Sequence, residues 1–187
     1  MTESFIFRTP RLGEHEPPLT PAERGIATHT LLQYIDYSRA ADRDGILSEI
    51  ARLRSMGQLS PRQAEAVEPE KVLRLFSSPT GIRIRNADRV SRELRFSLLS
   101  PAEEYFDGGE GESVLLQGVI DCCIEEDGEL TVIDYKTDRV RGDAVYERAE
   151  LYRSQLSAYA SAMERMTGKP VRECVLYFLD CGKAIKL

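Results

Sequence analysis

The chain has 187 residues, of which 42% are hydrophobic, and this content is enough to bury the core of one compact domain. Its 31 acidic residues outnumber its 25 basic ones, and the net charge of −6 excludes the broad basic surface of a free-standing DNA-binding protein. Because the sequence has no apolar run long enough to span a bilayer and no secretory leader, we expect a cytoplasmic protein that does not contact a membrane.

A linker or disordered arm is predicted at residues 1–20, where glycine and proline occur without apolar periodicity, and one domain is predicted over residues 21–187. The first helix begins at Thr20-Pro21-Ala22-Glu23, which combines a helix cap, a proline at the first helical position and a capping-box glutamate. His29 lies on this helix, one turn after Gly25 on the same face. Because glycine destabilises a helix interior, we expect another segment to approach closely at Gly25.

The middle of the chain is predicted to be helical from about Asp44 to Phe76, with an interruption near Gly57 and a helix cap at Ser60. An alternating segment follows from Glu93 to Leu99, and this period of two is typical of a half-buried strand. Glu93 is therefore either a solvated charge at the end of a strand, which is the more common case, or part of a site.

A β-hairpin is predicted around Asp127-Gly128, the strongest short hairpin signal, which two apolar runs flank at residues 113–124 and 129–137. If these two residues form the loop, Asp121 lies directly opposite Asp134 on the neighbouring strand. A four-residue loop also keeps both aspartates on one face, whereas a three-residue loop places them on opposite faces.

Two carboxylates and an ammonium group converge in this hairpin, because side chains alternate along a strand and Lys136 shares the face of Asp134. Carboxylate oxygens on a rigid sheet suit a hard ion such as Mg²⁺ or Mn²⁺, which can activate water for hydrolysis of phosphodiester bonds. We expect Lys136 to supply a fixed positive charge, because adjacent carboxylates stabilise its charged form. A solvent-facing hairpin with an ordinary Asp–Lys ion pair is the alternative, and spacing alone does not decide between them.

A long helix is predicted from about Tyr146 to Met166, followed by a strand over residues 171–179 and a short terminal run. Gln155 and Tyr159 lie one turn apart on this helix, and Tyr152 shares their stripe. Tyrosines at helical spacing usually pack in a core, but a glutamine among them needs hydrogen-bond partners. The order of helices, three strands, helix and strand predicts an α/β sandwich around a small mixed β-sheet flanked by helices.

Five segments stand in one order along the chain: Gly25-Ile-Ala-Thr-His29, Glu93, Gly118-Val-Ile-Asp121, Asp134-Tyr-Lys136 and Gln155-Leu-Ser-Ala-Tyr159. In this order and spacing the chain resembles the RecB-type branch of the PD-(D/E)xK nucleases, from about residue 21 to its last residue. Within that branch it is most similar to the carboxy-terminal nuclease domains of AddA-type helicase-nuclease subunits. The resemblance implies a restriction-endonuclease-like core and a Mg²⁺- or Mn²⁺-dependent deoxyribonuclease.

The resemblance also implies roles for individual residues. His29, Asp121 and Asp134 would be metal ligands, with the carbonyl oxygen of Tyr135 as a fourth, and Lys136 would be the catalytic lysine. Gln155 and Tyr159 would close the site and touch DNA, and Glu93 would belong to the same site.

Some RecB-type nucleases carry an iron–sulfur cluster, with one cysteine upstream of the histidine motif. This chain has no cysteine before Cys122, so we expect no cluster. Cys122 and Cys123 are neighbours on a strand and must point to opposite faces, and the sequence has no Cys-x-x-Cys motif. We expect buried, reduced thiols that behave as small hydrophobic side chains.

By resemblance, the function is that of a DNA exonuclease that processes double-strand-break ends on a single strand delivered by a helicase motor. The chain has no Gly-rich nucleotide-binding loop, so we expect a nuclease domain excised from a larger helicase-nuclease, with an AddB-like partner subunit. The alternatives are a stand-alone endonuclease of the same fold and a catalytically silent module that binds DNA ends or docks. A silent module would have lost a ligand or the lysine, so the presence of all of them favours the enzyme.

Overall fold

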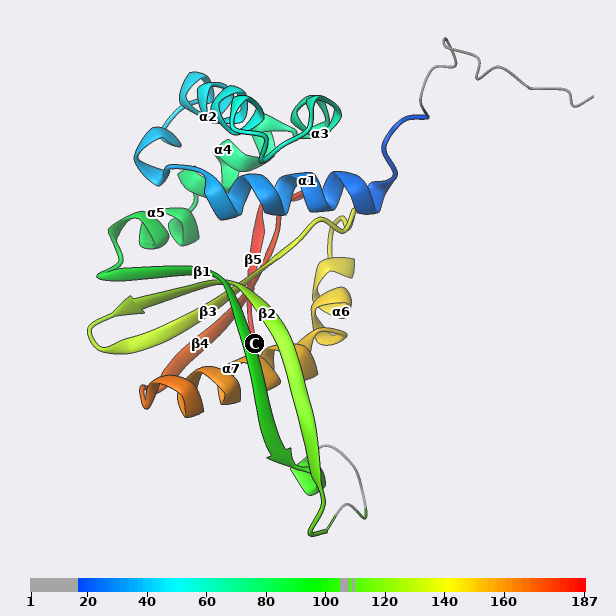
Figure 1. The fold of residues 1–187 in the computed structure, drawn as a ribbon, viewed down its shortest axis with the longest axis vertical. Helices are drawn as coiled ribbons and strands as arrows, with labels where there is room; N and C mark the ends of the chain where they lie inside the picture. Colours follow the sequence, from blue (N-terminus) through cyan, green and yellow to red (C-terminus); the bar gives the residue numbers. More distant parts are fainter. Residues whose placement is uncertain (1–16, 105–107, 109) are drawn as a thin grey trace, which may run out of the picture.

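The computed structural model describes residues 17–104, 108 and 110–187 (Figure 1). The predicted arm at residues 1–20 lies almost wholly outside the described residues, and its last four residues lead into the first helix without regular structure. None of the helices in this described part is long and apolar enough to cross a membrane.

In the described part of the chain, five α-helices precede the sheet: α1 (Pro21–Tyr34), α2 (Arg43–Ser55), α3 (Pro61–Ala66), α4 (Pro69–Ser77) and α5 (Pro79–Asn86). The capping box predicted at α1 is confirmed, since the Thr20 hydroxyl accepts a hydrogen bond from the Glu23 N–H and the Glu23 carboxylate accepts one from the Thr20 N–H. Ser60 caps α3 in the same way, which confirms the predicted helix start there.

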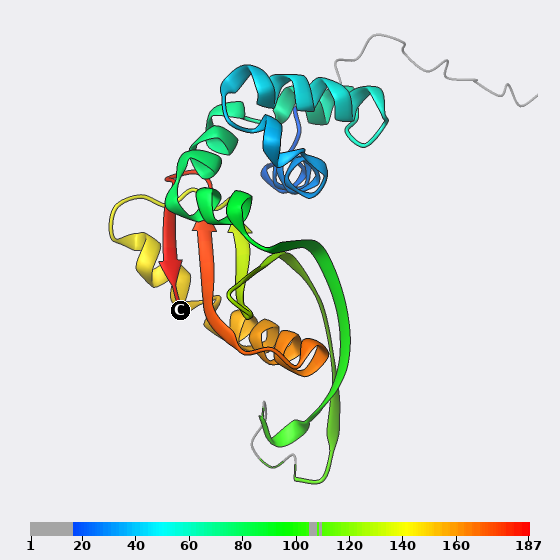
Figure 2. The same cartoon turned by 90° about the vertical axis from the view of Figure 1, so that its left-hand side faces the viewer.

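The sheet of the described residues has five strands in the order β1-β2-β3-β4-β5 (Figures 1 and 2). They are β1 (Arg89–Pro101), β2 (Ser113–Glu126), β3 (Glu129–Lys136), β4 (Val171–Phe178) and β5 (Lys183–Lys186). Neighbouring strands are antiparallel except β3 and β4, which are parallel. The predicted α/β fold with a small mixed sheet and flanking helices is confirmed.

The prediction of one long helix between β3 and β4 is wrong in one respect. The segment forms two helices, α6 (Ala144–Glu150) and α7 (Arg153–Thr167). The break falls at Tyr152, whose N–H bonds to the carbonyl of Ala149 three residues back, so the turn is tighter than in an α-helix. The Tyr152 hydroxyl is held by Asp138, in the loop after β3, at 3.0 Å. This tertiary contact fixes the side chain at the break.

The sheet separates two hydrophobic cores. Ile133 and Tyr135 pack in the core formed with α1–α5, whereas Val132 packs in the core formed with α6 and α7. Cys122 and Cys123 divide in the same way, which confirms that they point to opposite faces. All four cysteines are free thiols, and burial raises the pKa of Cys122 to about 12.

The hairpin between β2 and β3 has the predicted two-residue turn. Asp127 and Gly128 have φ values of 53° and 82°, and positive φ at both central residues is the requirement of a type I′ turn. The predicted register is confirmed for five cross-strand pairs, which run from Glu126–Glu129 to Cys122–Ile133. The pairing then stops, so the expected direct pairing of Asp121 with Asp134 does not form. From this point β2 pairs only with β1 among the residues that the structure describes.

Strands β1 and β2 form a two-stranded ribbon that continues beyond the end of the pairing with β3. At that point the side chains on one face of the ribbon pass from one hydrophobic core to the other. Cys122 packs with α1–α5, but Ile120, which would share its face in a regular strand, packs with α6 and α7. On β1, Arg92 stacks on a tyrosine of the first core, whereas Leu94 packs against the second. Glu93 lies between them with a φ of 50°, in the left-handed region that a glutamate rarely adopts. The strand predicted to begin near Glu93 therefore extends on both sides of it, and Glu93 marks the point where the ribbon changes face.

Gly118 lets the outer part of this ribbon pack closely on α7. A Cβ atom at Gly118 would lie 2.7 Å from the ring of Phe96 and 3.2 Å from the ring of Tyr159. These two rings pack edge to face with their centroids 5.7 Å apart. A side chain at this position would therefore push apart the contact that holds β1 and β2 against α7.

We predict that Gly118→Ala lowers the free energy of unfolding by about 1–3 kcal/mol, the range for forcing an extra methyl group into a packed core. Urea denaturation measures the change. Gln117→Ala, on the exposed face of the same strand, is the control and should change the value by less than about 0.5 kcal/mol. Equal stability of the two variants would contradict the role assigned to Gly118.

Candidate functional site

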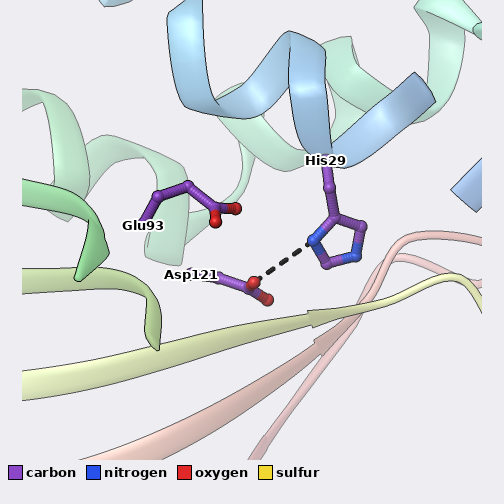
Figure 3. Close-up of side chains that lie close together, drawn as sticks. All are labelled: His29, Glu93 and Asp121. Carbon is purple, nitrogen blue, oxygen red and sulfur yellow. Dashed lines mark hydrogen bonds and ion pairs between the residues drawn. The ribbon is translucent and has the colours of Figure 1, made fainter. Parts of the chain in front are cut away.

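Three potential metal ligands from three different elements meet at the point where β2 leaves β3 (Figure 3). His29 comes from α1, Glu93 from β1 and Asp121 from β2, and one ligand atom of each lies within 4.8 Å of the other two. His29 Nδ1 is 3.2 Å from Asp121 Oδ1. An imidazole nitrogen with carboxylate oxygens is a donor set that binds divalent cations.

His29 reaches this position because α1 packs closely against the end of β3. A Cβ atom on Gly25 would lie 3.0 Å from the hydroxyl oxygen of Thr137, the residue that follows β3. The close approach predicted at Gly25 is therefore confirmed, and Thr137 is the residue that approaches. Since His29 lies one turn further along the same face of the helix, the contact sets its ring above Asp121.

Asp121 bridges the gap between the two separated strands. Its Oδ2 accepts a hydrogen bond of 2.8 Å from the backbone N–H of Tyr135 on β3, and its Oδ1 faces His29. The N–H and C=O groups of one residue point to the same side of an extended strand. The carbonyl of Tyr135, expected as a ligand from the family resemblance, thus faces the side on which Asp121 lies.

Asp134 and Lys136 form a buried ion pair beside this group, with Lys136 Nζ 2.7 Å from Asp134 Oδ2. Asp134 is only 3% exposed. Burial raises the pKa of its carboxyl group and the charge of Asp121 adds to the rise, while Lys136 opposes it. Among the residues that the structure describes, Oδ2 of Asp134 accepts no hydrogen bond of normal geometry. This oxygen therefore interacts with Lys136 through charge and keeps lone pairs that a bound cation could use.

The same crowding of negative charge acts on the neighbouring groups. Burial raises the pKa of Glu93, and the charge of Asp121 raises it further. Burial alone would lower the pKa of His29, but its hydrogen bond to Asp121 and the surrounding carboxylates outweigh burial, so this pKa is raised. Burial is the largest cause of the raised pKa values of Glu93 and Asp134, and neighbouring negative charge contributes to all three shifts. A cation would relieve this excess of negative charge, so the residues present fit a bound cation.

Gln155 and Tyr159 of α7 complete the surroundings of the lysine. Gln155 Oε1 accepts a hydrogen bond of 3.1 Å from Lys136 Nζ, and Gln155 Nε2 donates one of 2.7 Å to the Tyr159 hydroxyl. Tyr159 is 8% exposed and packs in the core of α6 and α7. Both interpretations of the Gln155–Tyr159 stripe are therefore correct: Tyr159 packs in the core, and it also holds Gln155 against Lys136.

The grouping differs in one respect from the one that the resemblance implied. Glu93, which the resemblance placed in the site without a specific role, lies together with His29 and Asp121. Asp134, expected as a metal ligand, lies beside that group and pairs with Lys136. The sequence interpretation assigned no site role to Tyr152, whose ring centroid is 3.9 Å from Lys136 Nζ. Its position three residues before Gln155, on the same helical face, was the signal available in the sequence.

A family model described as the PD-(D/E)XK nuclease superfamily matches residues 4–186. The chain belongs to this superfamily. Members of the superfamily generally depend on divalent metal ions, and the group of His29, Glu93 and Asp121 offers such an ion ligands.

Similar proteins include the A subunits of the ATP-dependent helicase/nucleases of Bacillus cereus (strain Q1) and Bacillus anthracis, each 40% identical over 179 residues. The protein of the same name from Bacillus mycoides (strain KBAB4) is 38% identical over the same length. In each case the match covers 90% of this chain and 14% of the relative. The chain thus corresponds to a small part of much longer proteins.

We predict that the backbone and the carboxylate of Glu93 have separable effects. The free energy of unfolding should be about 1 kcal/mol higher for Glu93→Gly than for Glu93→Ala, because glycine adopts a positive φ without strain. Both variants should bind Mn²⁺ about tenfold or more weakly than the native chain, as when a group close to a metal is removed. Urea denaturation and calorimetric titration with Mn²⁺ measure the two effects.

Asp127 supplies a matched control, because it also has a positive φ of 53° but lies in the exposed hairpin turn. Asp127→Gly and Asp127→Ala should reproduce the difference in stability and leave Mn²⁺ binding unchanged. Native Mn²⁺ affinity in both Glu93 variants would remove Glu93 from the site.

Proposed function

We propose that this chain is a nuclease domain that hydrolyses phosphodiester bonds of DNA with Mg²⁺ or Mn²⁺ during the processing of double-strand-break ends. The observation that carries the proposal is the convergence of His29, Glu93 and Asp121 beside the buried pair of Asp134 and Lys136. A catalytically silent module would not need to retain this convergence, because carboxylates held close together repel one another.

In this proposal His29 Nδ1 and the carboxylates of Asp121 and Asp134 would hold the ion, together with the Tyr135 carbonyl and Glu93. The bound ion supplies Lewis acidity, which polarises a phosphate and makes a water molecule more acidic. Before an ion binds, the contact between His29 Nδ1 and Asp121 Oδ1 holds the imidazole ring with this nitrogen directed toward the carboxylates. Because a metal ligand must offer a lone pair, His29 Nδ1 gives up any proton that it carries when it binds the ion.

Lys136 supplies positive charge where a phosphate gains negative charge during hydrolysis. Its Nζ donates to Gln155 and pairs with Asp134, and both contacts suit the charged ammonium form. Gln155 is held by Tyr159 from the core, so the lysine is positioned by a packed helix. This arrangement supports a role in electrostatic stabilisation and gives no support to a role as a base.

We further propose that the DNA strand reaches this site from a helicase motor, in a cytoplasmic complex with an AddB-like partner subunit, and is degraded as an exonuclease substrate. Two observations support this wider setting. The relatives are named helicase/nuclease subunits and are far longer than the matching segment. The net charge of −6 also means that the chain has little long-range attraction for DNA of its own.

Cleavage of end-labelled single-stranded DNA tests the proposed reaction, with Mg²⁺, Mn²⁺ or EDTA and with Asp134→Asn and Lys136→Met as variants. Cleavage should require a metal ion, and each variant should lower the rate by about 100-fold or more, the size of effect seen when one charge-stabilising group is removed. Asp127→Asn and Lys183→Met, which change residues away from the site, should cleave normally. The lengths of the labelled products separate exonuclease from endonuclease action.

Cleavage in EDTA, or full activity of both site variants, would refute the proposal. If the native chain cleaves nothing, calorimetric titration with Mn²⁺ decides between the remaining cases. Binding that is lost in Asp134→Asn would support a metal site that acts only with the motor and partner present, whereas no binding would support a silent module.

A further inference from the structure

The ammonium group of Lys136 lies on the face of an aromatic ring that the proposed reaction does not use. Its Nζ is 3.9 Å from the ring centroid of Tyr152, well within the range of a cation–π interaction. The side chain of Lys136 is only 14% exposed, so water weakens this attraction little. The ammonium group also contacts Asp134 Oδ2 and Gln155 Oε1.

The ring of Tyr152 is itself held in place. Its hydroxyl donates a hydrogen bond of 3.0 Å to Asp138 Oδ2, and Asp138 Oδ1 accepts one of 2.9 Å from Arg148 Nε on α6. Tyr152 also occupies the break between α6 and α7, where the backbone is tighter than in an α-helix. A tyrosine that served only as packing would need neither the charged partner nor this position.

The contact matters because lysine is a flexible side chain that carries a point charge and loses much rotational freedom when it is fixed. The Lys136 ammonium contacts Tyr152, Asp134 and Gln155, and of these three residues Asp134 is a candidate ligand of the proposed ion. A cation bound to Asp134 would compete with Lys136 for the negative charge and would repel the ammonium group. Tyr152 and Gln155 are then the partners that keep the lysine in place.

We propose that Tyr152, anchored by Asp138, is a positioning residue that holds the Lys136 ammonium against its ring while Asp134 binds a cation. The inference rests on the proposed nuclease function for its catalytic consequence, but not for the contact itself. It assigns the aromatic ring, and not the hydroxyl, as the group that acts on the lysine.

The kinetic test compares Tyr152→Phe, which keeps the ring, with Tyr152→Leu, which removes it. With saturating single-stranded DNA and Mn²⁺, Tyr152→Leu should lower kcat by about tenfold or more with KM unchanged, as expected for a desolvated cation–π contact. Tyr152→Phe should lower kcat by less than about threefold, since it loses a single hydrogen bond. Tyr146→Leu is the matched control, because Tyr146 makes a similar contact with Lys183 on the exposed side of α6 and its loss should leave kcat unchanged.

A second measurement does not depend on activity. The ε-methylene protons of Lys136, assigned by NMR through Lys136→Arg in selectively labelled protein, should show an upfield ring-current shift with and without Mg²⁺. Tyr152→Phe should keep this shift and Tyr152→Leu should abolish it, while thermal unfolding confirms that both variants are folded. Loss of the shift on Mg²⁺ addition to the native chain would overturn the proposal.

Equal kcat values for the Phe and Leu variants, or an effect on KM alone, would also overturn it. If the native chain cleaves no DNA, the Mn²⁺ titration described above decides the proposed function, and the NMR comparison decides separately whether Tyr152 holds the lysine. The two failures are therefore distinguishable.

Discussion

The separation of β2 from β3 after the Cys122–Ile133 pair is the constraint on which the site depends. Pairing that continued would close the sheet and leave no room for a ligand between the strands. Instead, the N–H of Tyr135 loses its cross-strand partner and is satisfied by the carboxylate of Asp121. One hydrogen bond thus fixes the orientation of Asp121 and compensates for the broken ladder, and it allows groups from α1, β1 and β3 to reach one place.

Electrostatic crowding is the second consequence of that opening. Glu93, Asp121 and Asp134 bring three carboxylates together, and the raised pKa values of Glu93 and Asp134 show that their ionised forms are disfavoured. Lys136 offsets part of this charge by pairing with Asp134, and His29 faces Asp121. Such crowding of like charges is unfavourable for the fold, which is a common relation between stability and function in sites that are built to bind a ligand.

The hydrophobic core formed with α6 and α7 supports Lys136 from the side away from the separated strands. Gly118 allows Phe96 and Tyr159 to pack together, Tyr159 holds Gln155, and Gln155 contacts Lys136. The lysine is consequently attached to a packed core through hydrogen bonds on one side, and rests on the ring of Tyr152 on the other. Its position therefore depends on hydrophobic packing as well as on charge.

The sequence by itself determined the features that local interactions control: the capping box at Thr20 and the turn at Asp127-Gly128 with its register. The tertiary structure alone decided where the ladder ends, that Glu93 adopts a positive φ, and that the predicted long helix breaks at Tyr152. The physical reason is the range of the forces involved. Caps and turns are set by residues a few positions apart, whereas these three features result from contacts between segments far apart in the chain, whose geometry no local pattern specifies.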